Sequence, residues 1–117
     1  MNSDKKFSIY KEVMPDEVII YLSGELDLSV APEMRSDLDP FVQQTKRKLT
    51  LNLKDLKYID STGIGIIVSI LKTRDSLKAA FGVEEVPAKI QRLFDITGIS
   101  QFLNPPEGSS ERKEEII

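Results

Sequence analysis

The chain has 117 residues, a formal net charge of −3, and 40% hydrophobic and 30% charged residues. This size and composition are typical of one globular domain that buries a core without metal ions or disulfides. The absence of histidine and cysteine excludes Cys/His zinc sites and nucleophile systems of the Ser-His-Asp or Cys-His type. The negative charge argues against nucleic-acid binding as the main function.

The longest apolar run, Ile64 to Leu71, is interrupted by Gly65 and Ser69. A run of this length is too short to cross a bilayer, and the N-terminal segment has no apolar stretch of signal-peptide length. We therefore expect a soluble, cytoplasmic protein that does not bind membranes.

The first half of the sequence predicts two strands, a helix and a third strand. Phe7 to Val13 and Val18 to Gly24 have strand patterns. The second of these is apolar on both faces, which predicts a central strand that is covered on both sides. A helix should begin at about Pro32, and Pro40 should kink or end it. Leu49 to Leu53 predicts the next strand.

The second half continues the alternation of helices and strands. Gly63 to about Asp75 predicts a deeply packed helix, and Lys78 to Val86 predicts a short fourth strand. A short helix is expected from Pro87 to Phe94, followed by a strand or helical turn at Ile99 to Leu103. This order indicates a single small α/β domain with a largely parallel sheet of about four to five strands and packed helices.

The domain should end near residue 104. From Asn104 onward the sequence has almost no apolar residues until Ile116. We expect residues 1–104 to form the domain and residues 105–117 to form a mobile, charged C-terminal tail.

The segment Asp60-Ser61-Thr62 stands between a predicted strand and a predicted helix, and Gly63 and Gly65 open that helix. One interpretation is structural: Asp and Ser are favoured helix N-caps, and the glycines allow close packing. The other is functional: an exposed Ser61 at a helix N-terminus can carry a phosphate, which the backbone N–H groups and the helix dipole accommodate. Asp60 would then orient a kinase or hold a bridging metal.

The segment "GELD" ends the second predicted strand, so Glu25 and Asp27 are expected at its carboxyl end, beside Asp60. The simple alternative is a strand end that leads into a helix. Three carboxylates there could bind Mg²⁺ weakly, or Asp27 and Asp60 could serve a small carboxylate enzyme. The enzyme is disfavoured, because the glycines are not followed by the lysine of a phosphate-binding loop.

Three segments resemble the STAS domain of bacterial anti-sigma factor antagonists, in particular those of the general stress response. They are "SGELD" at 23–27, "LNLKDLKYIDSTGIG" at 51–65 and "RLFDITGI" at 92–99. The resemblance covers roughly Phe7 to Leu103. It implies a small α/β domain with a mixed sheet and a regulatory protein that is not an enzyme and has no cofactor.

The resemblance also implies a regulatory cycle. The unphosphorylated protein would bind an anti-sigma factor and so release the sigma factor. The anti-sigma factor would double as a serine kinase, and a PP2C-type phosphatase would reverse its action. In the family the serine after the motif aspartate accepts the phosphate, which here is Ser61. The partner-binding residues implied are Asp27, Asp60, Ser61, Thr62 and Gly63.

An alternative within the same family is a scaffold subunit of a stressosome-like complex. Such a subunit would assemble into large particles, whereas the antagonist is expected to be a monomer or weak dimer when free. A measurement of particle size separates the two.

Overall fold

The computed structural model describes residues 6–103. The tail expected at residues 105–117 lies outside the described residues. In chain order the elements are β1 (Phe7–Val13), β2 (Glu17–Leu26), the 3₁₀ turn η1 (Leu28–Val30), α1 (Ala31–Val42), β3 (Lys48–Ile59), α2 (Ser61–Ser76), β4 (Phe81–Glu84), α3 (Ala88–Thr97) and α4 (Ser100–Leu103).

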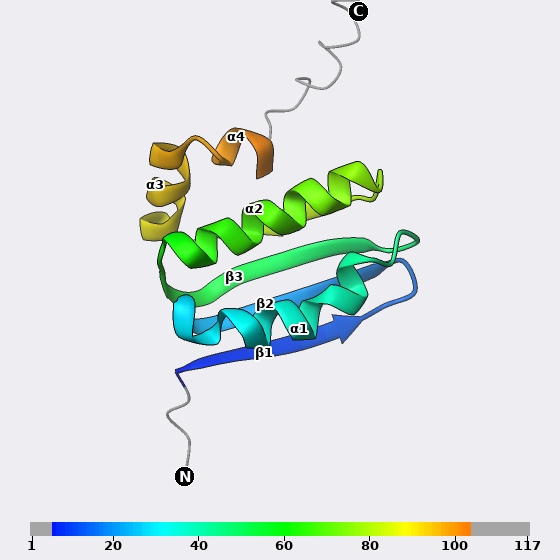
Figure 1. The fold of residues 1–117 in the computed structure, drawn as a ribbon, viewed down its shortest axis with the longest axis horizontal. Coiled ribbons are helices and arrows are strands. Elements are labelled where there is room, and N and C mark those ends of the chain that lie inside the picture. The colour runs from blue at the N-terminus through cyan, green and yellow to red at the C-terminus, as the bar shows by residue number, and fades with distance from the viewer. Residues whose placement is uncertain (1–5, 104–117) are drawn as a thin grey trace, which may run out of the picture.

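The four strands form one mixed sheet in the order β1-β2-β3-β4. β1 runs antiparallel to β2, whereas the β2–β3 and β3–β4 pairs are parallel. The helices α1 and α2 make the two crossovers and lie side by side on one face of the sheet (Figure 1). The α/β class and the largely parallel sheet expected from the sequence are confirmed.

The core lies between this helical layer and the sheet. Alternate residues of β2 point into it, and the parallel register sets Val18 beside Leu49 and Ile20 beside Leu51. The buried residues that the two long helices contribute are Ala31, Met34, Leu38 and Val42 from α1 and Gly63, Ile66, Ile67, Ile70 and Arg74 from α2. This alternation is the physical reason for the strand pattern of the sequence.

The opposite face of the sheet is partly open, so the expectation that β2 is covered on both sides is wrong. Ile19 and Tyr21 are only half-buried, and Tyr10, which pairs with Tyr21 across the β1–β2 ladder, is 67% exposed. Polar contacts stabilise this face, as when the Thr50 hydroxyl donates to the Glu17 carboxylate at 2.8 Å. Half-exposed aromatic and β-branched residues are common on such a face.

Arg74 is a fully buried cation at the end of the sheet where β3 and β4 begin. Its guanidinium donates to five backbone carbonyls, those of Phe41, Val42, Gln44, Arg47 and Ala80. Burial lowers the pKa of Arg74 below its usual value. The carbonyls of Phe41 and Val42 belong to the last turn of α1, where the helix dipole is negative, so Arg74 acts as a C-terminal cap of this helix. Its other contacts join the loops before β3 and β4.

Two boundaries in the first half of the chain differ from the sequence expectation. α1 is not broken at Pro40, which sits exposed in the last helical turn, only two residues before the helix ends. β3 continues well beyond Leu53, to Ile59, although Lys54 and Lys57 within this extension are exposed. The sequence did not predict this part of the strand, because its exposed charged residues interrupt the apolar pattern while Leu56 and Ile59 remain buried.

The second half agrees more closely. α2 begins at Ser61, two residues before the expected start, and β4 is confined to Phe81–Glu84. The uncertain segment at Ile99–Leu103 proves to be helical, as α4. Within residues 6–103, no helix is long and apolar enough to span a bilayer.

Candidate functional site

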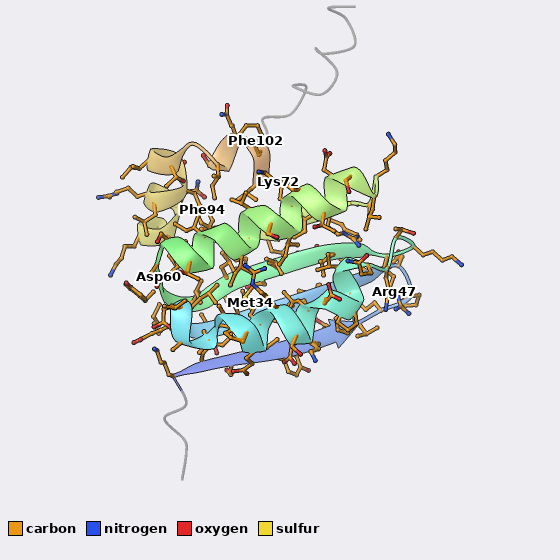
Figure 2. All side chains as sticks on the ribbon, in the orientation of Figure 1. Met34, Arg47, Asp60, Lys72, Phe94 and Phe102 are labelled. Atoms are coloured by element: carbon orange, nitrogen blue, oxygen red, sulfur yellow. The ribbon has the colours of Figure 1, made fainter. Side chains whose placement is uncertain are left out.

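The candidate site is a corner formed where β2 and β3 end. Leu26 pairs with Ile59, so the residues that follow them, Asp27 and Asp60, lie at neighbouring strand ends. The backbone N–H of Asp60 donates to the carbonyl of Leu26 at 3.2 Å and fixes this junction. The sequence expectation that the "GELD" and "DSTG" segments meet at the carboxyl edge of the sheet is confirmed. Figure 2 shows Asp60 at the start of α2.

Asp60 is the N-cap of α2 and also holds η1 in place. Its Oδ1 accepts a hydrogen bond from the backbone N–H of Gly63 at 2.9 Å, which is the usual capping contact. Its Oδ2 accepts from the backbone N–H of Leu28 at 3.3 Å. The structural interpretation of Asp60 is therefore confirmed, and one carboxylate links the two segments of the corner.

Ser61 is the first residue of α2 and is exposed. Thr62 beside it is half-buried. Gly65, one helical turn beyond Ser61, is exposed and on the same side of the helix. The hydroxyl of Ser61 is therefore exposed at the helix start, and the residue four positions further along, Gly65, adds no side chain beside it.

The two glycines of α2 have different roles. A Cβ at Gly63 would lie 2.7 Å from Cγ1 of Ile59 and 2.8 Å from the carbonyl oxygen of Leu26. Gly63 therefore lets α2 approach the ends of β2 and β3, as expected. A Cβ at Gly65 would meet nothing within 4 Å, so the same expectation is wrong for Gly65.

Asp27 is held by a lysine that the sequence analysis did not single out. The Lys6 ammonium lies 2.5 Å from Oδ2 of Asp27 and donates to the Ser29 hydroxyl at 3.0 Å. Oδ1 of Asp27 accepts from the backbone N–H of Ser29 at 3.0 Å and from its hydroxyl at 2.7 Å. Lys6, and then Ser29, lower the pKa of Asp27, while the hydrogen bond to Asp27 raises the pKa of Lys6.

The hairpin register places Lys6 in this corner. Phe7 pairs with Gly24, and the backbone N–H of Glu25 donates to the carbonyl of Lys6 at 2.9 Å. Gly24 has a φ of +93°, and a Cβ on it would lie 2.0 Å from the carbonyl oxygen of Lys6. The glycine of "SGELD" is therefore required for β1 to approach the corner.

Gly24→Ala should destabilise the fold by about 1–3 kcal/mol, because alanine disfavours this φ and its Cβ clashes with backbone. Thermal unfolding followed by circular dichroism measures the effect. The matched control is Gly65→Ala, which adds the same methyl group to an open helical position and should stabilise the protein by about 0.5–1 kcal/mol. Equal melting temperatures for the two variants would contradict the role assigned to Gly24.

The carboxylates of the corner are committed to contacts within the protein. Asp27 is bound to Lys6 and Ser29, and Asp60 to two backbone amides. In the part of the chain that the structure describes, no cluster of three or more Asp, Glu, His or Cys residues is arranged to hold a metal ion. The interpretation of Glu25, Asp27 and Asp60 as a magnesium site is therefore not supported by the geometry.

A small groove lies elsewhere, between α1 and α2, where it is lined by residues that include Leu38, Asp39, Ile66 and Ile70. The corner at Ser61 does not line this groove. An exposed serine, an exposed Leu28 at 69% and an exposed Tyr58 at 51% mark the corner instead. Such a surface suits contact with another protein better than enclosure of a small molecule.

Comparisons with known proteins agree on the family. Residues 8–112 match the STAS domain. The anti-sigma-B factor antagonist of Staphylococcus aureus (strain NCTC 8325 / PS 47) is 34% identical over 90 residues, which cover 77% of this chain and 83% of the relative.

Solved structures show the same fold. A putative anti-sigma factor antagonist from Thermotoga maritima has a TM-score of 0.75 at 28% identity, with 92% of each chain covered. The Bacillus cell fate determinant SpoIIAA in its phosphorylated form has a TM-score of 0.66 at 18% identity, covering 94% of this chain and 100% of SpoIIAA. The chain described here therefore belongs to the STAS domain family, among the bacterial anti-sigma factor antagonists.

Proposed function

We propose that this protein is a cytoplasmic, phosphorylation-switched antagonist of an anti-sigma factor. The unphosphorylated form binds the anti-sigma factor and releases the sigma factor. The anti-sigma factor is also a serine kinase, which phosphorylates Ser61 and ends the interaction. A PP2C-type phosphatase restores the active form, and the protein itself catalyses no reaction.

The observation that carries this proposal is the position of Ser61. It is exposed at the first residue of α2, directly after the capping Asp60 and in the corner that Asp27 shares. Helix N-termini accommodate phosphate, because their first backbone N–H groups have no partner within the helix. Asp60 already occupies the N–H of Gly63, so the amides nearest to Ser61 remain for the phosphate. The similarity in fold to a phosphorylated STAS protein, SpoIIAA, is consistent with such a site.

We assign the contact with the anti-sigma factor to the surface of the same corner. Ser61 is exposed there, Asp27, Asp60 and Thr62 are half-buried, and all four would contact the partner directly. Gly63 is buried against the strand ends, so it contributes by fixing the position of α2. The proposal requires the free protein to be small, a monomer or weak dimer. A large particle in size-exclusion chromatography would favour the scaffold function instead.

Ser61 should be the dominant phosphorylation site. Thr62 is adjacent, but it is half-buried and its β-branched side chain is stiffer. The kinase is obtained by pull-down of the bound partner from the native cytoplasm, and phosphopeptides are mapped after incubation with ATP. Label confined to Ser61, and absent from Ser61→Ala, is expected. Major label on Thr62 or on any other residue of the wild-type protein would contradict the assignment.

A further inference from the structure

Lys6 connects the parts of the corner that surround Ser61. Its ammonium binds Asp27 and the Ser29 hydroxyl, and so it holds the start of η1. The first residue of η1, Leu28, donates its backbone N–H to Asp60. Asp60 in turn caps the helix that Ser61 begins. A continuous set of contacts therefore runs from Lys6 to the residue before Ser61.

The charge of Lys6 faces an acidic surrounding. Asp27 raises the pKa of the Lys6 ammonium most strongly, through a hydrogen bond, and Glu25 and Asp60 add attraction at longer range. Lys6 and Asp27 form the one ion pair within residues 6–103. A phosphate on Ser61 would add roughly −1.5 to −2 charges to this corner at neutral pH, where Glu25, Asp27 and Asp60 already repel it.

We propose that Lys6 is the counter-cation of this corner and sets how readily a phosphate on Ser61 reaches its dianionic form. The inference rests on the proposed phosphorylation of Ser61. Its physical basis is that a fixed positive charge stabilises the dianion more than the monoanion. Without Lys6, the three carboxylates would act on the phosphate with less compensation.

The test uses the full chain with phosphoserine inserted at position 61 during translation, so that no kinase is needed. Phosphorus NMR follows the second ionisation of the phosphate as a function of pH. Lys6→Gln should move the titration midpoint upward by about 0.1–0.3 pH, the range expected for one charge at about 10 Å in a medium close to water, with and without screening by salt. Lys6→Arg keeps the charge and should leave the midpoint near that of the wild type.

Lys72→Gln is the matched control. Lys72 is exposed on the same helix and lies far along it from Asp60 (Figure 2). The rise per residue separates it from Ser61 by roughly 16 Å, which is beyond the screening length of about 10 Å at 0.1 M salt. This variant removes the same charge but should leave the midpoint unchanged.

Asp27→Asn tests a change of charge in the opposite direction. Removal of a negative charge from the corner should move the midpoint downward, and the variant keeps the question testable if Lys6→Gln folds poorly. The exposed Lys89 and Arg92 of α3 are tested as the competing cations. A larger shift in Lys89→Gln or Arg92→Gln than in Lys6→Gln would overturn the proposal, as would an unchanged midpoint in Lys6→Gln.

The outcome is separable from that of the proposed function. If the native kinase labels another residue, the switch at Ser61 is refuted, yet the titration still reports whether Lys6 controls the charge at this position. If Lys6→Gln leaves the titration midpoint unchanged while the kinase labels Ser61, the proposed phosphorylation switch is retained and only the role of Lys6 is refuted.

Discussion

Ile67→Asp should severely destabilise the folded state. Ile67 is 0% exposed and belongs to the core cluster in which the helices pack against the sheet. An aspartate there would either bury an unpaired charge or take up a proton, and it would also lose the apolar contacts of isoleucine. The combined cost is about 4 kcal/mol or more. Domains of this kind are stable by only about 5–15 kcal/mol.

Circular dichroism and thermal unfolding test this expectation. The wild type should melt cooperatively, whereas Ile67→Asp should melt at a much lower temperature or lack a transition. Ser69→Asp is the matched control, since it adds the same group to an exposed position on the same helix and should change little. A melting temperature of Ile67→Asp equal to that of the control would show that α2 is not packed as described.

The sequence pattern predicted this core because the apolar residues repeat at the spacing of the elements. The strand Val18–Leu22 was expected to be buried because it is apolar on both faces, and the helix that contains Ile67 was expected to be deeply packed. The length of β3 could not be predicted in the same way. Beyond Leu53 the buried positions are Leu56 and Ile59, which are three residues apart, and the register against β2 shifts in this region. An irregular strand of this kind loses its period of two.

The candidate site was predictable in its acidic and hydroxyl residues but not in its cation. Asp27 and Asp60 both follow strands, and parallel strands bring their carboxyl ends together. Lys6 precedes the first strand, and its place depends on the hairpin register and on the positive φ of Gly24. The glycine of "SGELD" was a usable signal for such a close approach. Arg74 carried no signal, because one arginine in an apolar helix resembles a solvent-facing residue until the loops around it are placed.

The fold should be nearly indifferent to the phosphorylation of Ser61. The dianion meets free N–H groups and the positive end of the helix dipole, an interaction worth about 0.3–1 kcal/mol near the surface. The adjacent carboxylate of Asp60 opposes this gain by a comparable amount. Ser61→Asp, phosphorylated wild type and Ser61→Ala should therefore all keep the circular dichroism of the unmodified protein. Loss of structure in any of them would indicate an order–disorder mechanism instead.

The affinity for the anti-sigma factor, in contrast, should fall strongly when residue 61 carries a negative charge. If Ser61 lies at the centre of the contact, a negative charge there must be desolvated without a counter-charge from the partner, which costs several kcal/mol. Each 1.4 kcal/mol corresponds to about tenfold in affinity. Ser61→Asp should thus weaken binding by about tenfold or more, and Ser69→Asp, with the same charge two turns away, should weaken it far less. Ser61→Ala should bind like the wild type and resist inactivation by ATP. Calorimetric titration of the partner into each form measures these affinities. Unchanged affinity in both Ser61→Asp and the phosphorylated protein would refute the electrostatic switch, because the added charge would then lie outside the contact.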